Sequence, residues 1–227
     1  MTYDLFIGNR LFSSWSLRGW LMLEKFGLPC TVHVMDLYGD GFAADMAPLD
    51  PARLVPVLRT PEGDIIGESL AIAETLAERH PDAGLWPRDP SLRARARWLC
   101  AEVASGFSAL RSECPMQLKG VNAGFRASDA VLADLDRLQK IWHAARQLAN
   151  HDGPWLLGEY SLADVFYTPV AARITGYDLR VSERSKKYCN DLLSDQSVRE
   201  WRAAALEKNY APFPYPVYQP VLPWPVG

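Results

Sequence analysis

Three serines lie close together near the start of the chain, in the stretch Phe12-Ser13-Ser14-Trp15-Ser16-Leu17-Arg18. An apolar run at 3–7 precedes them and is typical of a strand, and apolar residues at helical spacing follow over 16–26. The three hydroxyls are therefore predicted to lie where a strand turns into a helix. Backbone N–H groups at a helix N-terminus lack intrahelical partners and favour an anion. A hydroxyl at this point can cap the helix or donate to a bound anion.

The composition argues against several classes of protein. The chain has 227 residues, enough for one large domain or two small ones, and its apolar content of 48% supplies a core. The net charge of −3 comes without a basic stripe, which argues against nucleic acid as the main partner. No apolar run approaches a membrane span, and residues 1–10 have no basic segment followed by an apolar one. We therefore expect a cytoplasmic protein with neither a membrane nor nucleic acid as its partner.

The four cysteines do not form a recognisable site. Cys30, Cys100, Cys114 and Cys189 are scattered, with no CxxC pair and no histidine at ligand spacing. We expect buried free thiols, and neither a metal site nor a dithiol redox site.

The first eighty residues alternate between strand and helix patterns. We expect strands at 3–7, 30–37, 57–60 and 65–66, helices at 16–26 and 70–79, and a short irregular helix at 42–46. Ser69 is the predicted N-cap of the helix at 70–79. The resulting order is βαβ, then an irregular loop, then ββα, which predicts an α/β domain over 1–80.

Residues 81–90 contain prolines, a glycine and Trp86, which indicates a linker. Helices are expected at 92–114, 128–150, 162–173, 181–193 and 198–207, with no strand after Ile66, so 91–210 is predicted to be an all-α domain. A proline-rich tail follows at 211–227. We expect its aromatic residues to pack on the chain's own surface, the alternative being a polyproline II segment that binds a partner.

This order of elements, together with three short motifs, resembles the cytosolic glutathione S-transferase family. Residues 13–18 resemble the Ser-Ser-x-Ser-x-Arg turn of the zeta class, which includes the maleylacetoacetate isomerases. Gly67-Glu68-Ser69-Leu70-Ala71-Ile72 matches the family's Glu-Ser-x-Ala-Ile motif, and Ser161-Leu162-Ala163-Asp164 matches the capping box of its helical domain. The resemblance covers nearly the whole chain apart from the tail. It implies a thioredoxin-like N-terminal domain, an all-helical C-terminal domain and a homodimer.

The resemblance also implies a binding site for the tripeptide glutathione. Glu68 offers a carboxylate to the γ-glutamyl amine, and Ser69 offers its hydroxyl and neighbouring N–H groups to the γ-glutamyl carboxylate. Val55 and Pro56 correspond to the family's Val–cis-Pro pair, which pairs the Val55 backbone with the cysteinyl part of glutathione. Without the resemblance, Ser69 is only a helix cap, Glu68 a solvated acid and Pro56 a trans proline at a strand edge.

Ser13 aligns with the catalytic serine of the family. A hydroxyl that donates to the glutathione sulfur favours the thiolate, and so lowers the thiol pKa from its free value of about 8.5. Ser14 and Ser16 are further candidates for this hydroxyl, with helix capping as the alternative. Arg18 matches the arginine of the turn and either adds to the local field or braces the turn.

The sequence departs from the family pattern beside Val55. Leu54 stands where many members carry Lys or Gln, so Arg53 and His33 become the candidates for binding the glycyl carboxylate. Tyr3 comes too early to match the tyrosine of other classes. Cys30 does not match the nucleophilic cysteine of omega-like members.

Four residues are candidates for lining the pocket of the second substrate. They are Trp15, which replaces a smaller residue of the zeta pattern, and Phe107, Arg111 and Met116 in the helical domain. A core or surface role is the alternative for the last three.

Two functions remain in view. The first is an enzyme in which glutathione thiolate, activated by a serine hydroxyl, attacks a small electrophile by transfer, isomerisation or peroxide reduction. Glutathione is then a co-substrate and no metal is required. The second is a non-catalytic member that binds glutathione or a protein. The serine turn favours the enzyme.

Overall fold

The computed structural model describes residues 2–210 and 214–225. The chain divides into two compact units, Met1–Leu85 and Trp86–Gly227, and the division falls inside the segment 81–90 predicted as a linker. In the described residues, no helix is long and apolar enough to cross a membrane.

The first unit is built on a four-stranded sheet with the order β2-β1-β3-β4. The strands are β1 (Tyr3–Ile7), β2 (Cys30–Val34), β3 (Val57–Arg59) and β4 (Ile65–Ile66), and the helices are α1 (Ser14–Glu24), α2 (Phe42–Met46), η1 (Ala47–Leu49), α3 (Ser69–Arg79) and η2 (Pro81–Ala83). β1 runs parallel to β2 and antiparallel to β3, and β4 is antiparallel to β3. The predicted βαβ–ββα order and thioredoxin-like fold are confirmed.

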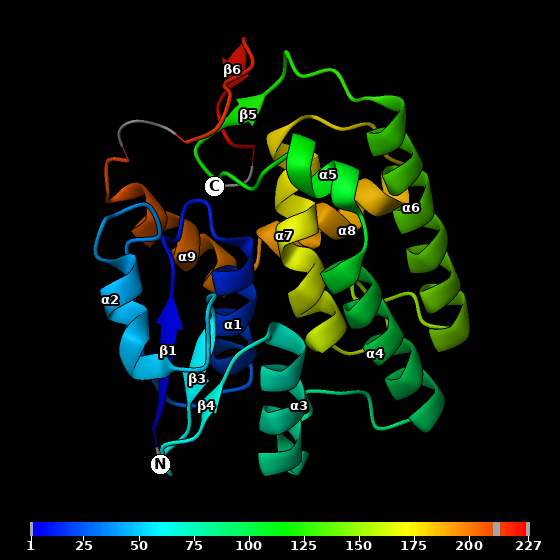
Figure 1. Ribbon diagram of the computed structural model, residues 1–227. Helices are drawn as coiled ribbons and strands as arrows, with labels where there is room; N and C mark the ends of the chain where they lie inside the picture. Colours follow the sequence, from blue (N-terminus) through cyan, green and yellow to red (C-terminus); the bar gives the residue numbers. More distant parts are fainter. Residues whose placement is uncertain (1, 211–213, 226–227) are drawn as a thin grey trace. The chain divides into compact units, whose positions relative to one another are not determined.

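Burial alternates along β1, as expected for a strand with helices on one face. Tyr3, Leu5 and Ile7 are buried, and α1 contacts both β1 and α3 (Figure 1). A second apolar cluster, formed by Met35, Met46, Leu49 and Val57, joins the α2–η1 segment to the sheet. The sheet thereby fixes the two segments that precede α1 and β3.

Gly19 lets α1 approach the loop before β3 unusually closely. A Cβ built on Gly19 would lie 2.7 Å from the Cβ of Pro56, which is closer than real Cβ atoms come. Because Gly19 has no side chain, Val55 and Pro56 can pack against α1, the helix that follows Ser13.

The second unit consists of helices around a buried central one. They are α4 (Pro90–Ser105), α5 (Ser108–Glu113), α6 (Asp129–Ala149), α7 (Leu162–Gly176), α8 (Glu183–Leu193) and α9 (Gln196–Leu206). In α7 every residue except Thr175 is buried, which explains why its sequence is apolar on all sides. The predicted helical domain is confirmed.

The single helix predicted over 92–114 was wrong, because the chain breaks between α4 and α5. Gly106 is extended and Phe107 has a left-handed backbone with φ of 54°. The Arg111 side chain donates to the Ala104 carbonyl oxygen at 2.9 Å, which satisfies one acceptor at the break. The apolar periodicity continues through the break, so the sequence pattern did not reveal it.

The expectation of no strand after Ile66 was also wrong. β5 (Val121–Asn122) pairs antiparallel with β6 (Val221–Leu222), so that the tail lies along the loop that follows α5 (Figure 1). A Cβ on Gly124 would lie 1.6 Å from the Gln219 carbonyl oxygen, so only glycine permits this contact. Strands of two residues are too short to give a sequence period.

Aromatic contacts hold the tail in the same place. The Tyr218 ring packs edge-on against Phe125, with 5.0 Å between centroids, and the Tyr218 N–H donates to the Asn122 side chain at 3.1 Å. The prediction that the tail packs on the chain itself is thus confirmed for 214–225. Residues 211–213 and 226–227 lie outside the described residues.

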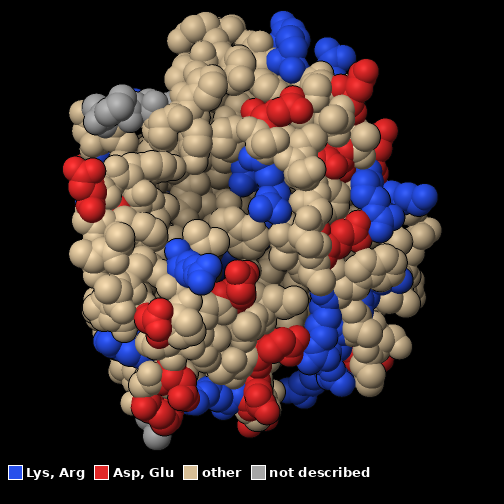
Figure 2. All heavy atoms as spheres, in the orientation of Figure 1, with Lys and Arg blue, Asp and Glu red and all other residues tan. Residues whose placement is uncertain are grey.

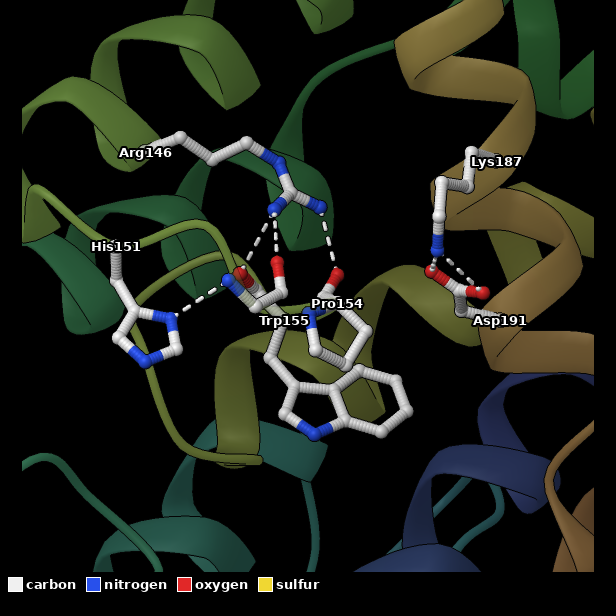
Figure 3. Close-up of polar contacts among 7 residues, drawn as sticks. Arg146, His151, Pro154, Trp155, Lys187 and Asp191 are labelled. Carbon is white, nitrogen blue, oxygen red and sulfur yellow. Dashed lines mark hydrogen bonds and ion pairs between the residues drawn. The ribbon is translucent and has the colours of Figure 1, made fainter.

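Arg146, near the end of α6, organises the loop that leads to α7. Its guanidinium donates to the three carbonyl oxygens of residues 153–155, at 2.7 to 3.0 Å, whereas Lys187 and Asp191 form an exposed pair on α8 (Figure 3). Burial lowers the pKa of Arg146. The bound loop places the Leu156 N–H at the start of α7.

Charges on the surface are mixed. On the face in Figure 2, basic and acidic side chains lie next to one another. Exposed ion pairs such as Arg137–Glu102 add little to stability.

Candidate active site

Ser13 is the N-cap of α1. Its backbone is extended, its Oγ accepts the Ser16 N–H at 3.3 Å, and its carbonyl oxygen accepts the Leu17 N–H at 3.1 Å. The predicted start of this helix, at 16, is corrected because α1 begins at Ser14. Of the three serines, only Ser13 precedes the helix.

The hydroxyls of Ser13 and Ser16 form one hydrogen-bonded chain. The Gly8 N–H donates to the Ser16 Oγ at 2.8 Å, and the two hydroxyl oxygens are 2.7 Å apart. Ser16 is fully buried, at 0% exposure, whereas Ser13 is 8% exposed. When the Ser16 hydroxyl donates to Ser13, the Ser13 proton is left for a third group.

Asn9 is a component of this turn that the sequence analysis missed. Its side-chain Oδ1 accepts the Phe12 N–H at 3.1 Å, and its carbonyl oxygen accepts the Ser13 N–H at 3.1 Å. Asn9 is 4% exposed, and its Nδ2 has no partner among the described residues. An asparagine three residues before Phe12 is the signal of an Asx-type turn and was available in the sequence.

The other residues of the serine stretch are mostly buried. Ser14 is 6% exposed and Arg18 is 3% exposed. The Arg18 guanidinium lies 4.4 Å from the centre of the half-buried Trp15 ring, a cation–π contact. This position agrees with Arg18 as a brace of the turn.

The start of α3 differs from the prediction. Its N-cap is Glu68, not Ser69, and Glu68 makes no side-chain capping bond. Glu68 is exposed with φ of 62°, an unusual value for a residue with a side chain, while Ser69 is the first helical residue and only 2% exposed. Within 2–210 and 214–225, no group accepts a hydrogen bond from the N–H groups of residues 69–71. The helix therefore presents unpaired donors beside a carboxylate.

The Val55–Pro56 peptide is cis, as the resemblance implied. Pro56 is buried and Val55 half-buried. In the described part of the chain, the Val55 N–H and C=O form no hydrogen bond, because β3 begins only at Val57. Leu54 and Arg53 beside it are exposed.

His33 has partners inside the first unit. Its Nε2 lies 2.7 Å from the Asp4 carboxylate, and its ring stacks on Phe6 at 4.6 Å. Bonds from His33 and then Arg59 hold the pKa of Asp4 below its usual value. These contacts account for His33 structurally and leave Arg53 as the candidate for the glycyl carboxylate.

Tyr3 and Cys30, which the sequence analysis did not assign to the site, have surroundings that account for them. The Tyr3 hydroxyl is 2.8 Å from His80 Nε2. Burial, followed by Glu24 and Asp4, raises the pKa of the Cys30 thiol to about 11, which is the opposite of what a nucleophilic cysteine needs.

The three helical candidates for the second-substrate pocket are held within their own unit. Phe107 is 6% exposed and Met116 is 1% exposed. Arg111 is half-buried and bound to a carbonyl at the α4–α5 break. Among the described residues, no group of three or more His, Cys, Asp or Glu side chains is placed to hold a metal.

The family model for the glutathione S-transferase N-terminal domain matches residues 12–79, which include the α1 and α3 sites. A probable maleylacetoacetate isomerase of Caenorhabditis elegans is 32% identical over 174 residues, covering 74% of this chain and 77% of that protein. The maleylacetoacetate isomerase of Rattus norvegicus is also 32% identical, covering 74% of this chain and 76% of that protein. The chain belongs to the glutathione S-transferase family.

Solved structures agree on the fold of this glutathione S-transferase family member. A Burkholderia glutathione transferase homologue with bound glutathione has a TM-score of 0.68 at 22% identity, covering 92% of this chain and all of the other. Glutathione transferase Omega 2S of Trametes versicolor also has a TM-score of 0.68 at 22% identity, covering 91% of this chain and 96% of the other. The family resemblance found in the sequence is confirmed, and the expected glutathione-dependent enzyme is supported by the named relatives.

Proposed function

We propose that this protein is a glutathione-dependent enzyme of the maleylacetoacetate isomerase-like kind, in which Ser13 stabilises the glutathione thiolate. The observation that carries the proposal is the hydrogen-bonded chain Gly8–Ser16–Ser13. In this chain of hydrogen bonds the buried Ser16 hydroxyl orients the Ser13 hydroxyl, so that Ser13 can donate its proton to the glutathione sulfur. The N-terminus of α1 adds a favourable field for a negative charge.

The remaining groups supply a cradle for the tripeptide. The unpaired N–H groups at the start of α3 and the buried Ser69 hydroxyl receive the γ-glutamyl carboxylate, and the exposed Glu68 receives its amine. The unpaired Val55 backbone pairs with the cysteinyl backbone, as a neighbouring strand would. Arg53 is the proposed partner of the glycyl carboxylate.

The chemistry follows from the thiolate. In isomerisation, the sulfur adds to a carbon of a conjugated double bond, the former double bond rotates as a single bond, and the thiolate leaves again. Glutathione is then regenerated, and no bond to the protein forms. The names of the relatives favour maleylacetoacetate as the first substrate to test. Transfer to another electrophile uses the same thiolate.

The decisive experiment measures the pKa of the bound glutathione thiol from thiolate absorbance against pH. Wild type is compared with Ser13→Ala and with the control Ser14→Ala. We expect Ser13→Ala to retain glutathione but to raise the thiol pKa by at least about one pH unit, since a hydrogen bond to a charged group contributes about 1.5–3 kcal/mol. An unchanged thiol pKa, or a wild type that does not bind glutathione, contradicts the proposal.

A second assay separates the reaction types. Isomerisation of maleylacetoacetate leaves the glutathione concentration unchanged, whereas transfer consumes glutathione in proportion to product. Binding without either reaction is the outcome expected of a non-catalytic member. The homodimer and the cytoplasmic location implied by the resemblance belong to the same proposal, and sedimentation tests the dimer.

A further inference from the structure

A cavity of about 310 Å³ in the helical unit is lined by α6 and by the first half of α8. Two aromatic side chains contribute to its lining, Trp142 of α6 and Tyr188 of α8, whose ring centroids are 5.0 Å apart. Most of the other lining residues are polar and come from α6 and from the start of α8. The volume lies at the lower end of the range for small-molecule sites. The proposed glutathione site uses none of these residues.

The start of α8 brings hydrogen-bond donors to this cavity. Within 2–210 and 214–225, the N–H groups of residues 183 and 184 have no acceptor, and such groups at the start of a helix favour an anion. The N-cap Ser182 donates its hydroxyl proton to the Ser185 Oγ at 3.0 Å. This bond leaves the proton of Ser185, which is 7% exposed, for a third group.

Arg146 supplies a buried charge that retains an unused donor. It is 7% exposed, and its Nη1 and Nη2 donate to the carbonyl oxygens of residues 153–155. Figure 3 shows these oxygens on one side of the guanidinium, with Nε farther from them than either Nη atom. In the described part of the chain, Nε donates to no acceptor and Arg146 forms no ion pair. Because Arg146 lines the cavity, a buried cation with an open donor borders this space.

Arg184 places a second guanidinium at the same cavity. It is exposed, and it has no ion pair among the described residues. Burial lowers the pKa of Arg146, and the charge of Arg184 also lowers it, so the two guanidinium groups are close enough to repel each other. Asp136, which is exposed, is the one carboxylate among the described residues of the lining. Two cations and one acid leave the cavity with a positive balance, which favours an anion.

We propose that this cavity binds a phosphate group, either as the free ion or at the end of a small phosphate monoester. The N–H groups at the start of α8, the Ser185 hydroxyl and the guanidinium groups of Arg146 and Arg184 donate to the phosphate oxygens. A phosphate dianion has enough oxygens and charge to use these donors together, whereas a carboxylate has two oxygens and one charge. The proposal does not rest on the glutathione site. If Arg146 serves only the loop and Arg184 is only a surface charge, phosphate will not bind here.

Calorimetric titration of the full-length protein with inorganic phosphate tests the site, with sodium chloride at equal ionic strength as the reference. We expect saturable binding, which Arg184→Gln should weaken about tenfold because a charge-assisted contact is lost. The matched control is Arg180→Gln, which removes an exposed arginine outside the lining. The control should change the affinity less than about twofold, since solvent and salt screen a charge at that distance.

Two further titrations sharpen the assignment. Asp136→Asn removes the carboxylate from the lining and should tighten phosphate binding about threefold, because repulsion of the dianion is relieved. Glycerol 3-phosphate distinguishes the two sources of the group: tighter binding of the ester supports a monoester as the ligand, and tighter binding of the inorganic ion supports free phosphate. Arg184 and Asp136 are exposed, so we expect both variants to fold. Absence of saturable phosphate binding to the wild type, or equal affinities of Arg184→Gln and Arg180→Gln, overturns the proposal.

Discussion

The starts of α3 and α7 are built from similar residues but are completed in opposite ways. At α7 the Asp164 carboxylate is fully buried and accepts hydrogen bonds from the Ser161 N–H at 3.0 Å, the Leu156 N–H at 3.1 Å and the Tyr188 hydroxyl at 2.9 Å. At α3 the Glu68 carboxylate is exposed, and no side chain of the described residues caps the helix.

The comparison shows how to distinguish a structural helix cap from a ligand site. At α7 the Ser161 N–H, the Leu156 N–H and the Tyr188 hydroxyl all donate to the Asp164 carboxylate, so the motif stabilises the helical unit. The donors at α3 have no partners in the described residues, and Glu68 adopts an unfavourable backbone conformation there. A strained backbone and N–H donors without acceptors lower the stability of the free protein. Such an arrangement is expected where a bound ligand accepts hydrogen bonds from those donors.

The largest expected effect comes from breaking the closed start of α7. Asp164→Ala leaves three buried donors without an acceptor, and we expect it to lower the free energy of unfolding by roughly 3 kcal/mol or more. Urea denaturation measures the change. The matched control is Asp89→Ala, which removes the exposed N-cap of α4 and should cost only about 1 kcal/mol. Equal losses in the two variants would show that burial of the cap is irrelevant.

The same carboxylate should make stability depend on pH. Burial raises the pKa of Asp164 from 3.8 to about 6, so the folded protein holds this proton more tightly than the unfolded chain. The resulting stabilisation is fully present below pH 3.8 and is lost as the pH rises through about 6, a change of about 3 kcal/mol. Asp164→Asn, which does not titrate, should therefore lose less stability than wild type between pH 4 and 7. Parallel curves of unfolding free energy against pH would contradict this assignment.

At the start of α3 we expect a substitution to change the affinity for glutathione more than it changes the free energy of unfolding. Ser69→Ala should weaken glutathione binding about tenfold, since a hydrogen bond to a carboxylate is lost, while changing the free energy of unfolding by less than about 1 kcal/mol. Calorimetric titration with glutathione measures the affinity. A stability loss without an affinity loss would make Ser69 a structural residue, like Ser161.

The smallest expected effect concerns the backbone of Glu68. Glycine adopts φ of 62° without steric cost, so Glu68→Gly should raise the free energy of unfolding by up to about 1 kcal/mol. The same change should weaken glutathione binding, because the carboxylate for the amine is gone. Glu68→Gln is the control that keeps the backbone strain and removes only the charge. A destabilised Glu68→Gly variant would mean that the side chain stabilises the fold.

Much of the fold could be predicted because its elements carry their own periodicity. The strand at Tyr3–Ile7 and the long helix at Asp129–Ala149 were both expected from the spacing of their apolar residues. The break at Gly106–Phe107 and the short strands β5 and β6 were not expected, because the break does not interrupt the apolar period and strands of two residues do not create one. The cis peptide at Val55 was expected only from the family resemblance.

The sequence by itself determined the order of elements in the first unit, the family and the residues from which the site is proposed to be built, because these depend on residue types and spacings along the chain. The tertiary structure decided which of these residues already have a hydrogen-bonding or charged partner within the protein. It buried Ser16 behind Ser13, paired His33 with Asp4 and left the start of α3 open. Whether a donor or a charge has a partner depends on groups far away in the chain, and only folding brings those groups together.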